Sequence, residues 1–391
     1  MGLLDLSRQL MRRCDELGGI SEERGRLTRR FASPAMRRAN RLVGSWMRAA
    51  GLQVREDAAF NLLGRWNSGQ RTAKTFLLGS HLDTVPDAGK YDGPLGVLTA
   101  IAAVQLLRER GVKLPFNLEV AGFSDEEGVR YQTMYLGSRA LAGTLTAVDR
   151  ARIAEKQIVK ARRRRGEFFG YAEVHIEQGP VLERHNLPVG VVTAIAGQSR
   201  LRVEFHGCAG HAGTVPMKLR QDALVGAAEL VLAVERCGVL GTVGKLEVAP
   251  GAGNVIPGHA LLTLDVRDQN DARRQAAVRS LHAQARAIAR QRGLKLTWTP
   301  VHQTAAVPCD THLVRTFSKC VARRGLEVFK LPSGAGHDAA ALSVICPVAM
   351  LFVRCKGGIS HNPVESVKAA DVALAIGVLA DFVQSLAPRD A

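Results

Sequence analysis

Four short segments of the chain concentrate side chains that bind divalent metals in proteins. These residues are His81, Asp83 and Asp92 in the first segment, Glu126 and Glu127 in the second, His175 in the third, and His361 in the fourth. Imidazole and carboxylate groups are ligands for Zn²⁺ and Mn²⁺, and three imidazoles with two or three carboxylates suffice for two such ions. The chemistry that this set supports is metal-assisted hydrolysis.

Each of these residues, taken singly, has an ordinary structural explanation. A lone histidine at a strand end is more often structural than a ligand, and a Glu-Glu pair is usually a solvated turn. The four segments share a position, however, because strand-like apolar runs precede them at residues 75–79, 116–123, 171–175 and 347–353. Open α/β sheets bind ligands beyond the carboxyl ends of their strands, so we expect the segments to converge.

Helices alternate with these strands. Helical patterns cover residues 3–17, 34–50, 96–110, 311–324 and 368–386. Ser33 is the expected N-cap of the second helix, with Pro34 at its first position. This alternation predicts an α/β domain with a largely parallel sheet.

The pattern changes near Gly197 and changes back near Pro308. The intervening segment predicts a strand at 201–205, a helix at 221–234, strands at 242–248 and 259–266, a helix at 271–290 and a strand at 295–301. The order βαββαβ is that of a ferredoxin-like α+β domain. We therefore expect a catalytic α/β domain of residues 1–196 and 308–391, with residues 197–307 inserted as a second domain.

Composition limits the function classes. The 391 residues include 53 Lys+Arg and 36 Asp+Glu, which gives a net charge of +17, and the 46% hydrophobic content excludes wholesale disorder. The densest basic run, Arg162–Arg165, is most simply a solvated loop. A non-enzymatic nucleic-acid binder is the competing class, although aromatic residues make up only 5% and no zinc finger is present.

Location can also be predicted. No uncharged apolar run is long enough to span a membrane, and the N-terminal region lacks the apolar core of a signal peptide. The seven cysteines are scattered without a Cys-x-x-Cys pair, as in proteins with reduced thiols. We expect a cytoplasmic protein with no membrane or nucleic-acid partner.

Six motifs together carry a family resemblance. They are His-Leu-Asp-Thr at 81–84, Tyr-Asp-Gly at 91–93, Asp-Glu-Glu-Gly at 125–128, His-Ile-Glu-Gln-Gly at 175–179, Gly-His-Ala-Gly at 210–213 and Ser-His-Asn-Pro at 360–363. The chain resembles the di-metal, metal-dependent amidohydrolases of the aminoacylase/carboxypeptidase superfamily. Within it, the sequence is most similar to the branch of allantoate amidohydrolases, N-carbamoyl-L-amino-acid hydrolases and β-ureidopropionases.

The resemblance implies a role for each metal-type residue. Asp92 would bridge two divalent ions, Mn²⁺ or Zn²⁺. His81 and His175 would complete one site, and Glu127 and His361 the other. Of the two remaining residues, Glu126 would be the general base, and Asp83 would orient the first histidine.

It also implies substrate contacts and an assembly. His211 would polarise the scissile carbonyl as a catalytic residue, and the substrate-binding positions are Gln178, His211, Asn254, Arg267 and Ser360. Gln178 would contact the ureido group, and a guanidinium such as that of Arg267 suits a carboxylate. The family implies a homodimer through the inserted lid, with His211 reaching the opposite subunit. Whether Asn254 and Arg267 serve their own subunit or the partner stays open.

The expected reaction is hydrolysis of a linear ureido C–N bond in a small anionic substrate. The segments 87–93 and 352–358 look most like allantoate amidohydrolases, which convert allantoate to ureidoglycine, ammonia and CO₂. N-carbamoyl-L-amino acids are the alternative substrates. Both classes carry a ureido group beside a carboxylate, so residue chemistry alone does not separate them.

Overall fold

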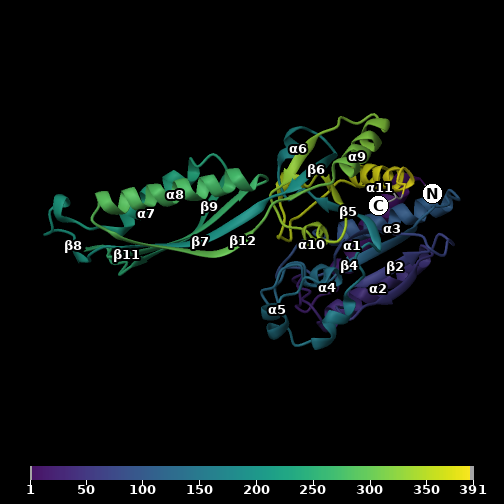
Figure 1. Cartoon of the computed structure of the whole chain (residues 1–391), viewed down its shortest axis with the longest axis horizontal. Helices are drawn as coiled ribbons and strands as arrows, with labels where there is room; N and C mark the ends of the chain where they lie inside the picture. The colour runs from purple at the N-terminus through teal and green to yellow at the C-terminus, as the bar shows by residue number, and fades with distance from the viewer. Residues whose placement is uncertain (1, 388–391) are drawn as a thin grey trace. The chain divides into compact units, whose positions relative to one another are not determined.

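The chain forms two compact units (Figure 1). The computed structural model describes residues 2–387, and Met1 and residues 388–391 lie outside the described part. The first unit contains the residues up to Thr193 and from Cys309 onward, and the second runs from Ala194 to Pro308.

A nine-stranded sheet is the centre of the first unit, although its short edge strand at Val307–Pro308 and the last two residues of the strand that ends at Ile195 fall within the second. Its strands are β1 (Gln53–Glu56), β2 (Leu62–Trp66), β3 (Thr75–His81), β4 (Asn117–Phe123), β5 (Phe168–Ile176), β6 (Val189–Ile195), β13 (Val307–Pro308), β14 (Lys330–Ser333) and β15 (Val348–Val353). They lie in the order β1-β2-β4-β3-β5-β15-β6-β13, and β14 also pairs with β6. The four middle strands, β4, β3, β5 and β15, run parallel to one another.

The sheet is mixed, which corrects the expectation of a largely parallel one. Strands β1 and β2 pair antiparallel, β2 pairs antiparallel with β4, and β6 pairs antiparallel with β15. The short connection between β1 and β2 explains the first case, because a parallel pair needs a crossover of a dozen residues or more. The parallel middle is the part that brings strand ends to one edge.

Helices surround this sheet. They are α1 (Leu3–Gly18), α2 (Pro34–Ala49), α3 (Pro94–Glu109), α4 (Leu136–Ala142), α5 (Ala147–Arg152), α6 (Val181–Arg184), α9 (Thr311–Arg323), α10 (Asp338–Leu342) and α11 (Ala369–Gln384), with 3₁₀ turns η1 (Lys156–Ala161) and η3 (Lys356–Gly358). Ser33 caps α2 as predicted, since its side chain accepts a hydrogen bond from the amide of Met36 at 3.1 Å. Helix α3 is buried for most of its length, because it packs on β3 and β5 and contacts both α1 and α11.

The second unit contains a four-stranded antiparallel sheet. Its elements are β7 (Gly197–His206), β8 (Gly210–His211), η2 (Met217–Leu219), α7 (Ala223–Glu235), β9 (Leu240–Ala249), β10 (Val255–Ile256), β11 (His259–Asp268), α8 (Asp271–Gln291) and β12 (Lys295–Thr304). The sheet order is β12-β7-β11-β9, and β8 and β10 form a separate two-stranded ribbon.

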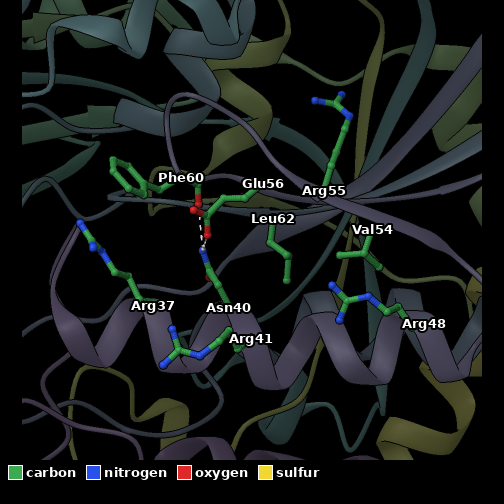
Figure 2. Close-up of a pocket in the computed structure, with 9 residues that line it drawn as sticks. All are labelled: Arg37, Asn40, Arg41, Arg48, Val54, Arg55, Glu56, Phe60 and Leu62. Carbon is green, nitrogen blue, oxygen red and sulfur yellow. Dashed lines mark hydrogen bonds between the residues drawn. The ribbon is translucent and has the colours of Figure 1, made fainter.

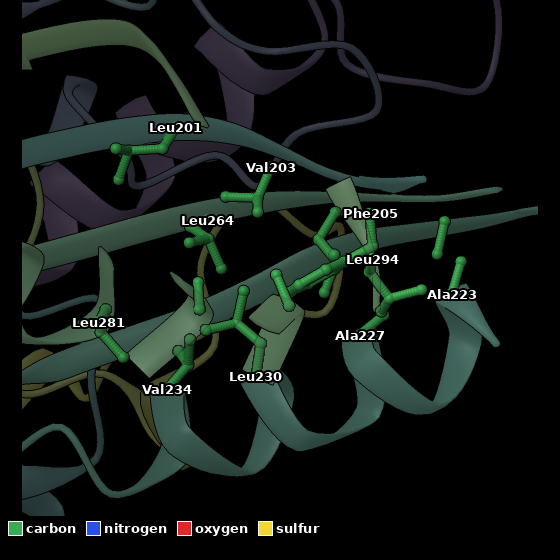
Figure 3. Packing of buried hydrophobic residues seen from close by; sticks show 14 of the residues in the cluster. Leu201, Val203, Phe205, Ala223, Ala227, Leu230, Val234, Leu264, Leu281 and Leu294 are labelled. Atoms are coloured by element: carbon green, nitrogen blue, oxygen red, sulfur yellow. The ribbon is translucent and has the colours of Figure 1, made fainter. Parts of the chain in front are cut away.

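Side-chain periodicity explains why this second sheet has one apolar face. Along β7, Leu201, Val203 and Phe205 are buried, whereas Arg200 and Arg202 are exposed. Figure 3 shows the buried side chains of the strands meeting those of the helices. The helical contributors recur at intervals of three or four residues, as on one helix face: Ala223, Ala227, Leu230 and Val234 from α7, and Ala277, Leu281, Ala285 and Ala289 from α8.

Within residues 2–387, no helix combines the length and the apolar character that a bilayer crossing requires.

Candidate metal centre

The four middle strands of the large sheet end beside one another. His81 is the last residue of β3, and His175 is the penultimate residue of β5. Glu126 and Glu127 lie in the turn after β4, and His361 lies in the loop after β15. Because these strands are parallel neighbours, their carboxyl ends share one edge of the sheet. The structure therefore brings together the four segments that the sequence analysis singled out.

Asp92 lies at the centre of the cluster. Its Oδ1 is 3.1 Å from Nε2 of His175 and 3.6 Å from Nε2 of His81. Its Oδ2 is 3.1 Å from Nε2 of His361, and that nitrogen is 3.2 Å from Oε1 of Glu127. Asp92 thus belongs to two groups of three ligand atoms, one with each of its oxygens.

Backbone carbonyls fix the orientation of two imidazoles. Nδ1 of His81 is 3.1 Å from the carbonyl oxygen of Asp83, and Nδ1 of His175 is 2.9 Å from that of Ile176. A carbonyl oxygen only accepts hydrogen bonds, so each Nδ1 carries a proton and donates it. Each Nε2 is then directed at Asp92 and can bind a cation, as metal-ligating histidines require.

The charge balance of the cluster also fits cations. Oδ1 of Asp92 is buried without a hydrogen-bond partner, which is costly for a carboxylate. Burial opposes ionisation of Asp92, but the imidazoles of His175, His361 and His81 that face its carboxylate hold its pKa well below the usual range. Hydrogen bonds to Asp92 and Glu127 raise the pKa of His361 to about 10. Protons therefore occupy the positions that two divalent ions would take, and the residues fit such ions.

Glu126 has a different environment from the adjacent Glu127. It is buried, and this burial together with the neighbouring carboxylates of Glu127, Asp338 and Asp83 raises its pKa well above the usual range. Its Oε1 has no hydrogen-bond partner among the described residues. Divalent cations beside it would favour the ionised form. Glu126 is therefore placed to accept a proton once cations are bound.

Asp83 does more for the acidic turn than for the first histidine. Its two carboxylate oxygens accept hydrogen bonds from the amides of Glu126 and Glu127, at 3.0 and 3.2 Å. The nearer carboxylate oxygen is 3.7 Å from Nδ1 of His81, whereas the carbonyl of Asp83 is at 3.1 Å. The backbone of Asp83 thus orients the His81 ring, and its side chain holds the turn that carries Glu126.

Gln178 and Ser360 both contact the bridging carboxylate. Nε2 of Gln178 donates to Oδ2 of Asp92 at 2.9 Å, and the Ser360 hydroxyl donates to the same oxygen at 2.6 Å. Oε1 of Gln178 is left without a hydrogen-bond partner among the described residues.

The second unit brings His211 and Asn254 together. His211 in β8 pairs with Val255 in β10, and the carbonyl of Asn254 accepts a hydrogen bond from the amide of Ala212 at 2.9 Å. Nδ1 of His211 accepts from the amide of Gly213 at 3.1 Å. The neutral His211 ring therefore carries its proton on Nε2, which makes Nε2 a hydrogen-bond donor.

Arg267 is already engaged by a carboxylate. Its Nε and Nη2 donate to the two oxygens of Asp265, at 2.9 and 3.0 Å. Gln198 donates to Asp265 as well, at 2.6 Å. A substrate carboxylate bound by Arg267 would share the guanidinium with Asp265.

Glu173 and Glu365 lie beside the cluster, and neither has a role predicted from the sequence. Glu173 lies two residues before His175 on β5 and accepts hydrogen bonds from Ser80 at 2.9 Å and Tyr171 at 3.1 Å. Glu173 and His175 are two residues apart on one strand, so their side chains share one face of the sheet. This spacing was the sequence signal for Glu173. Glu365 lies two residues after the last motif and accepts hydrogen bonds from the amides of Tyr91 and Asp92, which no local pattern indicates.

A separate hollow of about 370 Å³ lies between α2 and β1 (Figure 2). Four arginines line it: Arg37, Arg41, Arg48 and Arg55. Its carboxylate, Glu56, accepts a hydrogen bond from Asn40 at 2.7 Å. With no histidine in its lining and this single carboxylate, the hollow lacks the groups for metal chemistry. The basic run Arg162–Arg165 is also apart from the cluster, and its Arg163 pairs with Glu119 and Glu167.

Known proteins share both the sequence and the fold of this chain. Allantoate deiminase 2 of Glycine max is 40% identical over 440 aligned positions, covering 98% of this chain and 91% of that protein. The N-carbamoyl-L-amino acid amidohydrolase of Geobacillus stearothermophilus is 40% identical, covering 97% of this chain and 98% of that protein.

The structural and family matches agree with these relatives. A crystal structure of an amidase of the hydantoinase/carbamoylase family from Burkholderia multivorans has a TM-score of 0.91 at 30% identity, covering 97% of both chains. Residues 77–385 match Peptidase family M20/M25/M40. The resemblance to metal-dependent amidohydrolases that the motifs indicated is confirmed, and the chain belongs to the M20/M25/M40 peptidase family.

Proposed function

We propose that this protein is a metal-dependent amidohydrolase that cleaves a linear ureido C–N bond, with allantoate as the favoured substrate. The observation that carries the proposal is the cluster of three imidazoles and the Glu127 carboxylate around Asp92, with Glu126 beside it. The relatives support the reaction class, since one is named an allantoate deiminase and another an N-carbamoyl-L-amino acid amidohydrolase. The second name favours N-carbamoyl-L-amino acids as the second candidate substrate class.

The proposed cofactors are two divalent ions, Zn²⁺ or Mn²⁺. One would be held by His81, Asp92 and His175, and the other by Asp92, Glu127 and His361. When bound, such ions supply Lewis acidity toward the ureido carbonyl and lower the pKa of a water molecule.

The chain's own residues perform the proton transfers. Glu126 accepts a proton from the attacking water while the water oxygen bonds to the ureido carbon. Glu126 then gives that proton to the leaving nitrogen. On allantoate, cleavage at the terminal nitrogen releases ammonia, and the remaining carbamate loses CO₂ to give ureidoglycine. Gln178 and Ser360 lie against Asp92 and would orient the ureido group.

The inserted unit is proposed as a ferredoxin-like lid that also forms a homodimer. Strand β9 forms an edge of its sheet, and an unpaired edge is a template for a strand from another copy. Helix α7 exposes Val225 and Leu232 on its outer side. His211 in β8 presents an Nε2 donor, which suits a developing oxyanion. We propose that this donor enters the active site of the opposite subunit.

Substrate assays test the reaction. Metal-loaded protein is incubated with allantoate and with a panel of N-carbamoyl-L-amino acids, and ammonia and amine products are measured. We expect chelator-sensitive release of ammonia from allantoate, and loss of bound metal in Asp92→Ala. A preference for the N-carbamoyl panel would select the second candidate. Salt-sensitive DNA binding that chelators do not change, together with no turnover of either substrate class, would instead favour a nucleic-acid binder.

Subunit mixing tests the role of His211. His211→Ala and Glu126→Gln proteins, each inactive, are combined under conditions that exchange subunits. If His211 acts in the opposite subunit, each heterodimer has one site without either defect and recovers about half of the wild-type activity. Verified exchange without recovery would assign His211 to its own subunit or to no catalytic step.

A further inference from the structure

Glu365 is a buried carboxylate in the loop that follows β15, with 4% of its surface exposed. Its Oε2 accepts hydrogen bonds from the amides of Tyr91 and Asp92, at 2.8 and 3.1 Å. These amides precede the first residue of α3, so neither a helix nor a strand supplies their acceptor. The Glu365 side chain thus holds the backbone of residues 89–93, the loop that carries Asp92 and is called the Asp92 loop below.

Glu365 also reaches Asp92 through a side chain. The Ser360 hydroxyl oxygen lies 3.2 Å from Oε1 of Glu365 and donates to Oδ2 of Asp92 at 2.6 Å. The single Ser360 proton goes to Asp92, so Glu365 holds the backbone of Asp92 directly and lies against the hydroxyl that binds its carboxylate.

Gly89 packs so closely against Glu365 that no side chain fits at position 89. A Cβ placed on Gly89 would overlap the carboxyl group of Glu365. The Asp92 loop therefore passes directly over that carboxylate, and glycine is the residue that permits the approach.

We propose that Glu365 is a positioning residue that sets the place of Asp92 between two cations. The inference rests on the metal centre of the proposed function. A shared ligand must meet both ions within a few tenths of an ångström, and residues that orient ligands commonly change metal affinity when replaced. Because Glu365 acts by accepting N–H hydrogen bonds, the acceptor oxygen matters more than the negative charge.

Two substitutions separate the acceptor from the volume of the side chain. Glu365→Leu fills similar space but accepts no hydrogen bond, whereas the amide oxygen of Glu365→Gln can accept from both backbone amides. Metal-free proteins are titrated with Zn²⁺ against a chromophoric chelator. We expect the apparent Zn²⁺ affinity to fall about ten- to a hundredfold in Glu365→Leu and to stay within about threefold in Glu365→Gln.

Two further variants keep the test decisive. Gly89→Ala displaces the carboxyl group without altering Glu365 and should also weaken Zn²⁺ binding, even if Glu365→Leu fails to fold. Glu183→Leu is the matched control, because Glu183 also accepts a hydrogen bond from a loop amide, that of Gly357 at 2.6 Å, and among the described residues it makes no hydrogen bond to Tyr91 or Asp92. Its Zn²⁺ affinity should match the wild type. Circular dichroism and melting of the metal-free proteins check the fold.

Each alternative result has one meaning. Wild-type Zn²⁺ affinity in Glu365→Leu overturns the inference, as does a loss in Glu365→Gln equal to that in Glu365→Leu. Failure of the wild-type protein itself to bind Zn²⁺ overturns the metal centre of the proposed function, and the role of Glu365 with it.

Discussion

Glu126 and Glu127 are neighbours in sequence with separate environments. Glu127 faces His361 at 3.2 Å, whereas Glu126 is enclosed among other carboxylates and has an oxygen without a partner. Successive residues of a turn direct their side chains differently, so a ligand and a base can be adjacent. The Asp83 carboxylate accepts hydrogen bonds from the amides of Glu126 and Glu127 and thereby fixes the backbone from which the two side chains project.

Replacing Glu126 by glutamine tests this division of roles. The amide has nearly the same size but cannot accept the proton of water, so we expect kcat to fall by about a hundredfold or more. Bound metal, measured by elemental analysis, should stay at the wild-type level, whereas Glu127→Gln should lower it. Near-normal turnover of Glu126→Gln would remove this residue from the reaction.

His361 makes metal binding depend on pH. Its pKa of about 10 in the metal-free chain means that it is protonated at neutral pH, and a cation must displace that proton. Metal affinity should therefore rise as pH increases from about 6 to about 9, with proton release on binding. Calorimetry in two buffers of different ionisation enthalpy measures the release. A pH-independent affinity would contradict a ligand role for His361.

At the scale of elements, periodic patterns predicted the long helices and strands closely. The pattern at 34–50 corresponds to α2 at Pro34–Ala49, and that at 271–290 corresponds to α8 at Asp271–Gln291. The strands β8, β10 and β13 are two residues long each, which is too short for any period. The antiparallel pairing of the flanking strands was not predicted, because the direction in which two strands pair depends on the connection between them, which local patterns do not describe.

The site shows the same division between local and distant information. Strand ends bearing His or Glu can be recognised locally, and the structure brings those residues together. Glu365 acts on Asp92 across 273 positions of sequence, so only the folded chain shows the contact. Likewise, no spacing rule indicates that the Asp83 side chain binds the amides at 126 and 127.

The helix–sheet core of the second unit predicts a stability effect. Leu281 in α8 is fully buried against the sheet, so Leu281→Ala should lower the free energy of unfolding by about 2–5 kcal/mol. Leu219→Ala is the matched control, because Leu219 is 73% exposed and should change stability little. Denaturant titrations of both variants give the comparison. Equal stability of the two would contradict the assigned packing.

At the scale of the whole molecule, the net charge of +17 is the dominant feature. Arginines gather around the hollow between α2 and β1 (Figure 2), and further basic residues lie at Arg162–Arg165. A positive field of this kind raises the local concentration of anions. It is compatible with a small anionic substrate without any direct contact from these arginines.

Salt should therefore reduce the capture of the proposed substrate. We expect kcat/KM for allantoate to fall by about tenfold between low ionic strength and about 0.3 M salt, because exposed charges are screened. The kcat at saturating substrate should change little. An uncharged ureido compound serves as the control, and its kcat/KM should not respond. A rise of kcat/KM with salt would exclude electrostatic attraction.

The chain leaves the first unit and returns to it at almost the same point. The amide of Cys309 donates to the carbonyl of Thr193 at 2.9 Å, and β13 pairs with the end of β6 immediately beyond. A tight turn could join Thr193 to Cys309 without rerouting a single strand of the large sheet. The two halves of the first unit are thus continuous in space although a whole domain separates them in sequence. In evolutionary terms, one recombination event could have introduced the inserted unit into a simpler ancestor, and a comparable exchange could replace it.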